Sequence, residues 1–287
     1  MTDTLTGRRL GAYAIRDLLG SGGMGSVYRG YDAALDREVA VKVIKSGALA
    51  PDAVQRFRRE ARLAASLRHP NIVQVYTFDD TGDMLYMVQE LLPGPTLAEQ
   101  IRRAGKRCVS LDKVRRVVMQ LAVALDYAHE RGVVHRDVKP ANALYNAAGD
   151  LVLTDFGLAR PADTSSSAAT GPGLVMGTPG YVAPEQAVSS VGLSKACDIY
   201  SLGVVTFELL TGRLPFEADT PMGIVLKHLY EAPPPPTSLR STLPPAVDAV
   251  VIRALHKEPE RRYSSAGALA AALALALPEA RSVNATA

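Results

Sequence analysis

The chain has no tryptophan, only two cysteines and no long hydrophobic run. Cys108 and Cys197 lie far apart in the sequence, without the close spacing of a metal site, so we expect reduced thiols in a cytoplasmic protein. The longest apolar run, 266–277, is shorter than the roughly 20 residues that a bilayer requires. We therefore expect no membrane span in this chain, and a final buried helix with Leu269, Leu273 and Leu277 on one face.

Strong charge of either sign is also missing. The formal net charge is +3 over 287 residues, so no global positive field favours nucleic acid as a partner. Residues 1–12 contain Arg8 and Arg9 but no apolar run of the kind that follows in a secretory signal. The length is sufficient for one large core or for two lobes.

The pattern of apolar residues changes near residue 92. Before it, strand-like runs at 39–44 and 85–88 surround one helix, which starts near Pro51. Beyond 92–95, helical periodicity dominates. Ser110 is placed as the N-cap of a long helix, and later helices are expected at 198–211, 221–230, 246–256 and 264–277. This order predicts an α+β fold.

A glycine-rich segment runs from Gly20 to Val27 and fits the spacing G-x-G-x-x-G-x-V. Dinucleotide-binding turns share this glycine spacing, but there the third glycine opens a helix. Here 26–29 reads as a strand, and this favours a hairpin whose backbone N–H groups approach phosphate oxygens. An oxidoreductase of the dinucleotide-binding type is thereby excluded.

Lys42 interrupts an otherwise apolar strand, Val39 to Ile44. A buried lysine is costly unless it is paired. In the helix that follows, Glu60 shares a face with Phe57 and Ala64, which leaves it open either to Lys42 or to a surface ion pair with a neighbouring arginine.

Two further segments complete a set of motifs. The first is His135-Arg136-Asp137-Val138-Lys139-Pro140-Ala141-Asn142, and the second is Asp155-Phe156-Gly157. In this order after Lys42, they resemble the signature set of the protein kinases, and in particular bacterial Ser/Thr kinases of the eukaryotic (Hanks) type. The resemblance covers about Tyr13 to Leu277.

The resemblance implies a bilobal kinase fold over residues 13–277. A small lobe at 13–91 would hold a five-stranded sheet and one helix. A hinge at about 89–95 would lead to a larger, mainly helical lobe at 96–277. Residues 1–12 and 278–287 are then expected to be tails.

It also implies transfer of the γ-phosphoryl group of MgATP to Ser or Thr hydroxyls of proteins. Asp137 would orient the acceptor hydroxyl and Lys139 would contact the transferred group. Mg²⁺, for which Mn²⁺ can substitute, would be held by Asn142 and Asp155. The Lys42–Glu60 pair would hold the α- and β-phosphates.

Adenine would lie at the hinge, where Gln89 takes the gatekeeper position in place of the more usual apolar residue. Backbone groups of Glu90 and Leu92 would read the edge of the base. The full set of nucleotide-binding residues is then Leu19, Gly20, Gly22, Gly25, Val27, Ala40, Lys42, Gln89, Glu90, Leu92 and Leu144.

Several supporting positions are also filled. Thr178 would lie near the acceptor hydroxyl, and with Lys139 it favours Ser/Thr substrates. Glu185 would pair with Arg262, Asp198 would anchor the catalytic loop, and His135 and Phe156 would join the apolar column of the lobes. Because Arg136 precedes Asp137, phosphorylation of the following loop is expected to activate the enzyme. The candidate sites are Thr170, Thr164, Ser165, Ser166 and Ser167.

The alternative is a pseudokinase scaffold that binds nucleotide and partners without efficient transfer. Such proteins usually lack a residue equivalent to Lys42, Asp137 or Asp155, and all three are present. Expected partners are protein substrates with Ser or Thr acceptors, and the resemblance leaves room for a homodimer that phosphorylates itself in trans.

Overall fold

The computed structural model describes residues 5–22, 25–45, 61–81, 84–105, 108–156, 179–188 and 192–277. The chain divides into two compact units. The first consists of Met1–Gly94 and Leu144–Gly177, and the second of Pro95–Ala143 and Thr178–Ala287. The segment that starts at Leu144 thus belongs to the first unit. The expected lobes at 13–91 and 96–277 and the expected hinge at about 89–95 stay predictions.

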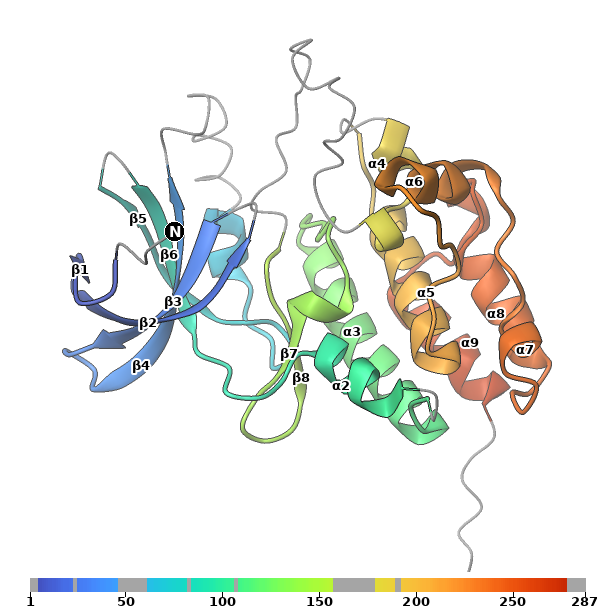
Figure 1. The fold of residues 1–287 in the computed structure, drawn as a ribbon, viewed down its shortest axis with the longest axis horizontal. Coiled ribbons are helices and arrows are strands. Elements are labelled where there is room, and N and C mark those ends of the chain that lie inside the picture. The colour runs from blue at the N-terminus through green and yellow to red at the C-terminus, as the bar shows by residue number, and fades with distance from the viewer. Residues whose placement is uncertain are drawn as a thin grey trace, which may run out of the picture. The chain divides into compact units, whose positions relative to one another are not determined.

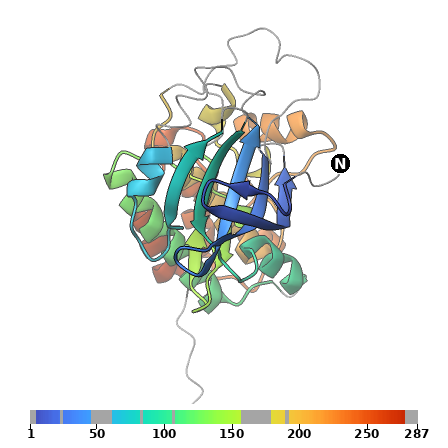
Figure 2. The same cartoon turned by 90° about the vertical axis from the view of Figure 1, so that its left-hand side faces the viewer.

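The first unit is built on a six-stranded antiparallel sheet with the order β1-β2-β3-β4-β6-β5 (Figure 1 and Figure 2). One strand more than predicted is present, because the two-residue β1 lies in the stretch that was expected to be a tail. Leu5 and Leu10 in that stretch are buried in the core of the sheet, and this apolar burial holds it in place. The strands are β1 Arg9–Leu10, β2 Tyr13–Gly22, β3 Gly25–Asp32, β4 Arg37–Lys45, β5 Val75–Asp80 and β6 Met84–Glu90.

The two faces of this sheet differ in chemistry. Side chains alternate along a strand, so Val39, Val41 and Val43 of β4 enter one core cluster together with Tyr86 and Val88 of β6. The residues between them point to the other face. There the register pairs Ala40 with Gln89 and Lys42 with Met87. Val27, which is paired with Lys42, alternates with the core residue Tyr28 and lies on the same second face.

A short two-stranded sheet explains why the chain returns to the first unit. It is formed by β7, Ala143–Tyr145, and β8, Leu151–Leu153. The side-chain amide of Asn71 donates to the Leu151 carbonyl oxygen at 2.7 Å. Leu144 and Val152 pack with Val73 and Leu92 in a second apolar cluster.

The second unit is helical, as predicted. Its first two helices are α2, Leu97–Ala104, and α3, Leu111–Glu130. Ser110 accepts a hydrogen bond from the backbone N–H of Lys113, so the expected N-cap is confirmed. The later helices are α4 Pro184–Val188, α5 Ala196–Thr211, α6 Pro221–Tyr230, α7 Pro236–Leu239, α8 Ala246–Ala254 and α9 Ala266–Ala276.

The core of this unit surrounds α5, which is buried on nearly every side. Helices α3, α8 and α9 pack against it. In α9, Leu269, Leu273 and the following Leu277 are buried, as the four-residue spacing predicted. Among the helices in the described part of the chain, none is both long and apolar enough to cross a membrane.

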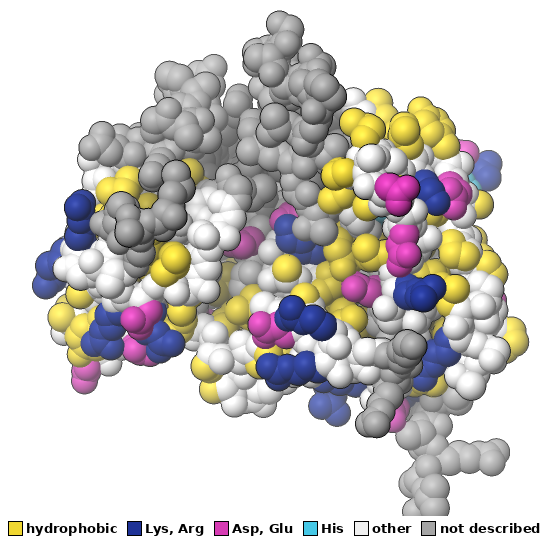
Figure 3. Space-filling model, in the orientation of Figure 1, with side chains coloured by type: hydrophobic (Ala, Val, Ile, Leu, Met, Phe, Trp, Pro, Cys, Tyr) yellow, Lys and Arg dark blue, Asp and Glu magenta, His cyan; other side chains and the backbone are white. Residues whose placement is uncertain are grey.

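Hydrophobic side chains are also exposed on the second unit, over α4 and α6 (Figure 3). Val188, Met222, Leu226 and Tyr230 are each at least 48% exposed. The three from α6 follow one another at four-residue spacing and so line one stripe of that helix. These residues contribute to a surface rather than to the core.

A fully buried histidine lies in the core of the second unit. The Nδ1 atom of His228 is 2.8 Å from the Tyr200 hydroxyl, and its ring packs edge-on against Phe216. The Lys257 ammonium group donates to the His228 carbonyl oxygen at 2.7 Å. Burial first, and the charge of Lys257 second, lower the pKa of His228 to about 4.

The pKa of His228 predicts an acid-sensitive core. The unfolded chain binds a proton at this histidine from about pH 6.5 downward, whereas the folded chain does so only near pH 4. The contribution to the free energy of unfolding is therefore complete above pH 6.5 and decreases by about 3 kcal/mol as the pH falls to 4.

Urea unfolding of the wild type and of a His228→Gln variant across this range tests the prediction. We expect the variant to be less stable at pH 7 and the difference to close by pH 4. A stability difference that does not change with pH would contradict it.

Candidate functional site

Three predicted catalytic residues meet in the segment between α3 and β7. The Asp137 carboxylate oxygen Oδ2 accepts from Lys139 Nζ at 2.8 Å and from Asn142 Nδ2 at 2.9 Å. Asn142 Nδ2 also donates to the Asp137 carbonyl oxygen. The short 3₁₀ helix Pro140–Asn142 turns Asn142 back toward Asp137. The side chain of Asp137 thus has a fixed direction in the second unit.

The loop that carries Asp137 is held by the buried carboxylate of Asp198, on α5. This carboxylate accepts from the backbone N–H groups of His135 at 2.8 Å and Arg136 at 2.7 Å. His129 Nε2 lies 2.7 Å from its Oδ2 atom. A carboxylate that is fully removed from water needs such partners. It also holds Arg136 at φ 65°, a left-handed conformation that non-glycine residues rarely adopt.

Two contacts of this loop were not anticipated from the sequence. The Gln186 side chain donates to the Arg136 carbonyl oxygen at 2.8 Å and accepts from the Ala183 N–H at 3.0 Å. His129, which was given no role, reaches Asp198 from α3. Gln186 directly follows Glu185, the predicted partner of Arg262, and that adjacency was the one available signal.

The His135 ring faces its own loop. Its Nδ1 atom accepts from the Asp137 backbone N–H at 3.2 Å, and the residue is fully buried. With Nδ1 acting as an acceptor, the ring proton of a neutral imidazole is on Nε2. His135 therefore supports the backbone at Asp137. The expected apolar column with Phe156 involves both units and stays a prediction.

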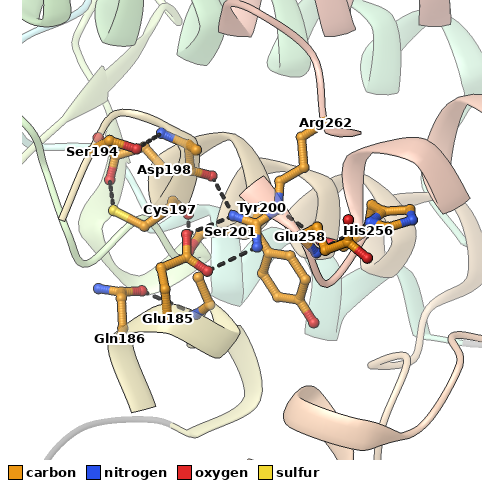
Figure 4. A network of polar contacts seen from close by, with 12 residues as sticks. Glu185, Gln186, Ser194, Cys197, Asp198, Tyr200, Ser201, His256, Glu258 and Arg262 are labelled. Carbon is orange, nitrogen blue, oxygen red and sulfur yellow. Dashed lines mark hydrogen bonds and ion pairs between the residues drawn. The ribbon is translucent and has the colours of Figure 1, made fainter. Parts of the chain in front are cut away.

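Arg262 and Glu185 form a bidentate ion pair, with N–O distances of 2.6 and 2.8 Å (Figure 4). The Arg262 side chain is fully buried and also donates to the carbonyl oxygens of His256, Ala196 and Lys257. Its guanidinium group lies over the Tyr200 ring. The guanidinium group of Arg262 thus joins α4 to α5 and to the segment before α9. A planar guanidinium group can make these several hydrogen bonds at once, and the ammonium group of a lysine cannot.

A second buried pair links Tyr181 to α5. The Tyr181 hydroxyl donates to Glu208 at 2.6 Å. Burial raises the pKa of both groups. The nearby carboxylate of Glu208 raises the pKa of Tyr181 further. Sequence reasoning missed Glu208, because one acidic residue in an apolar helix carries no motif.

In the first unit, Lys42 Nζ forms an ion pair with Asp155 Oδ1 at 2.7 Å. The Lys42 side chain is 8% exposed, so the pair supplies the partner that a buried ammonium group requires. Asp155 is at φ 61°, a second strained position. Glu60, the predicted partner of Lys42, lies outside the described residues, and its pairing stays a prediction.

The glycine-rich segment forms the hairpin of β2 and β3, in which Gly22 pairs with Gly25. Gly25 is at φ 138°, and a Cβ atom there would lie 2.1 Å from the Val43 carbonyl oxygen. Any other residue at this position would clash with β4. The predicted strand at 26–29 is part of β3.

All of the predicted nucleotide-binding residues belong to the first unit. Val27, Ala40, Lys42 and Gln89 share the second face of the sheet, as the register shows. Of the remaining candidates, several lie outside the described residues. These are the candidate phosphorylation sites Thr164, Ser165, Ser166, Ser167 and Thr170, together with Thr178.

The pair of Arg262 and Glu185 can be tested directly. Arg262→Lys removes the bidentate contact and leaves buried carbonyl oxygens without donors, so we expect the free energy of unfolding to fall by about 3 kcal/mol. Arg261→Lys is the matched control, because Arg261 makes an exposed pair with Glu258 and should change stability by less than about 0.5 kcal/mol. Denaturant unfolding measures the free energy of unfolding of both variants. Equal losses would show that the buried Arg262–Glu185 pair does not stabilise the unit.

Comparison with known proteins agrees with this geometry. Residues 13–273 match the family described as protein kinase domain. The chain is 43% identical over 268 residues to the serine/threonine-protein kinase PksC of Streptomyces coelicolor, covering 90% of this chain and 48% of PksC. It is 41% identical over 277 residues to PknA of Mycobacterium tuberculosis, covering 94% of this chain and 62% of PknA.

Solved structures are also similar. The crystal structure of the PknI kinase domain of Mycobacterium tuberculosis superimposes with a TM-score of 0.76 at 27% sequence identity, covering 94% of this chain and 98% of that domain. The chain spans about half the length of the curated relatives it matches. With the family match extending over most of its residues, the chain belongs to the protein kinase domain family.

Proposed function

We propose that this chain is the catalytic domain of an ATP-dependent serine/threonine protein kinase. One observation carries the proposal: Asp137, Lys139 and Asn142 are joined by hydrogen bonds on a loop whose backbone is fixed by a buried carboxylate. Relatives at about 40% identity are named serine/threonine-protein kinases, which supports the same activity here.

In this proposal Asp137 orients the acceptor hydroxyl group. Its carboxylate accepts a hydrogen bond from the acceptor hydroxyl. That hydrogen bond points a lone pair of the hydroxyl oxygen at the phosphorus of the γ-phosphoryl group. Lys139 forms an ion pair with Asp137, and its side chain is long enough to place the ammonium group on the oxygens of the transferred phosphoryl group. Charge that builds up during transfer is then neutralised by a group that is already in position.

Lys42 and Asp155 serve the nucleotide. When phosphates bind, Lys42 neutralises the α- and β-phosphate oxygens, with Asp155 or Glu60 as its carboxylate partner. Asp155 and Asn142 supply hard oxygen donors of the kind that Mg²⁺ prefers, and two protein ligands suffice because this ion retains water and phosphate ligands. Mg²⁺, or Mn²⁺ in its place, would supply charge neutralisation between the phosphates.

Adenine would occupy the second face of the sheet, next to the backbone that follows β6. Ala40 and Val27 would contact one side of the ring and Leu144 the other. The backbone N–H of Glu90 donates to the Gln74 carbonyl oxygen at 2.9 Å and is therefore already paired, so the carbonyl oxygen of Glu90 is the group of this residue that would read the base.

The acceptor is proposed to be Ser or Thr, on the basis of Lys139 and Thr178. Phosphorylation in the segment from Thr164 to Thr170 is proposed to activate transfer. Arg136 is the candidate cation for such a phosphate, which carries nearly two negative charges. A homodimer is one way to bring this segment of one copy to Asp137 of another.

A pseudokinase scaffold is the second candidate. It would bind nucleotide through the first unit without needing the loop geometry around Asp137. The hydrogen bonds that join Asp137 to Lys139 and Asn142 favour phosphoryl transfer over nucleotide binding alone.

The activity is tested with radiolabelled ATP, Mg²⁺ and a basic protein substrate, comparing the wild type with Asp137→Asn. The amide keeps the size of the side chain but accepts the hydroxyl hydrogen bond poorly, so we expect transfer to fall at least about 10³-fold. Binding of MgATP should change by less than about threefold, because Asp137 is not proposed to contact the nucleotide. Hydrolysis of the products identifies the acceptor.

Label on P–Ser and P–Thr in the wild type alone would support the proposal. Equal transfer by both proteins would refute the role of Asp137. MgATP binding without any transfer, even after attempts to phosphorylate the loop, would favour the scaffold.

Phosphosite mapping after incubation with MgATP tests the proposed switch. We expect modification between Thr164 and Thr170, with Thr170 as the main site. An active enzyme in which all five candidates stay unmodified would contradict this expectation.

A further inference from the structure

The side-chain amide of Gln89 is the unusual feature of β6. The residue is 7% exposed, and its Oε1 atom has no hydrogen-bond partner within the described part of the chain. A buried carbonyl oxygen without a donor destabilises the folded state, and such groups in native proteins call for a functional explanation. A methionine of similar size would carry no such cost.

The place of Gln89 in the sheet suggests that explanation. Its neighbour Val88 enters the apolar core of the first unit, so Gln89 lies on the opposite face. Ala40 is directly across from it, and Lys42 is one step further along β4 on the same face. Lys42 there forms its ion pair with Asp155. The unpaired amide oxygen is therefore on the face that carries the proposed phosphate-binding lysine.

The chemistry of adenine supplies the missing donor. Its exocyclic amino group has two N–H bonds, and a backbone carbonyl oxygen in the segment after Gln89 can accept only one of them in the plane of the ring. The second N–H then needs another acceptor. Ala40 has the smallest side chain that still carries a Cβ, which leaves room for a flat ring beside Gln89.

We propose that Gln89 Oε1 accepts a hydrogen bond from the exocyclic amino group of adenine. Gln89 is then a specificity-determining residue, which selects a 6-amino purine by contact and not only by the shape of the site. The inference rests on the proposed function, because it requires that the second face of the sheet binds a nucleotide.

Two nucleotides and three variants test it. We would measure the dissociation constants of MgATP and of the magnesium complex of purine riboside triphosphate, which lacks the amino group. The wild type should prefer ATP by about tenfold or more, since two hydrogen bonds to the amino group are lost. In Gln89→Met and Gln89→Leu this preference should fall about fivefold, because only the backbone contact remains.

Stability of the nucleotide-free protein is a second readout. Removing an unpaired buried oxygen should leave the Tm of Gln89→Met unchanged or raise it by a few degrees. Gln74→Met is the matched control, because the Gln74 amide is paired: it accepts from Arg68 Nη1 at 3.0 Å and donates to the Val75 carbonyl oxygen at 2.8 Å. That variant should lower the Tm and keep the wild-type preference for ATP.

The outcomes separate the inference from the function it rests on. If the wild type and both Gln89 variants bind nucleotides with the same preference for ATP, the contact with Gln89 is refuted while the kinase proposal stands. If the wild type binds neither nucleotide, the proposed function fails and the inference fails with it. A reduced preference in both Gln89 variants, with Gln74→Met unchanged, supports the contact.

Discussion

The buried carboxylate of Asp198 is the constraint on which the loop that carries Asp137 depends. It is fully removed from water, and it is compensated by two backbone N–H groups of the loop and by His129. A carboxylate in this position can be stable only if the loop adopts one backbone path, since any other path would leave the charge unpaired. That path includes the left-handed conformation of Arg136. Asp137, the next residue, is positioned as a consequence.

In the first unit, burial of apolar side chains determines which face of the sheet carries the polar residues. An antiparallel sheet has two faces. Burial of the valines of β4 on one face directs Ala40 and Lys42 to the other, and burial of Val88 of β6 does the same for Gln89. Lys42 is compensated there by Asp155, whereas Gln89 is not compensated within the described residues. The hydrophobic core thus selects which face is polar, and the polar face retains groups whose partners we propose to belong to a nucleotide. Phosphate and base recognition would then follow from a single strand register.

Motif spacing predicted a large part of this arrangement. The helices of the second unit and the cap at Ser110 follow from local periodicity, whereas the hydrogen bonds that join Asp137 to Lys139 and Asn142 were not predicted. The sequence did not predict β1, because two residues give no periodic signal. It also did not predict that the segment after Leu144 belongs to the first unit. Gln186, His129 and Glu208 were also missed. Each acts through a contact that is distant in sequence or lies outside any motif, so only the packed structure brings it to its partner.

We propose that Asp198 acts on catalysis by holding the loop, not by contacting substrate or nucleotide. The most direct test is the steady-state kinetics of Asp198→Asn, with kcat and the KM for ATP measured separately. The amide offers one acceptor oxygen where the carboxylate offers two, so the loop loses at least one anchor while the residues of the first unit are untouched. We predict a large fall in kcat, about 10²-fold or more, with a KM for ATP within about threefold of the wild type. An unchanged kcat, or a loss expressed mainly in KM for ATP, would contradict it.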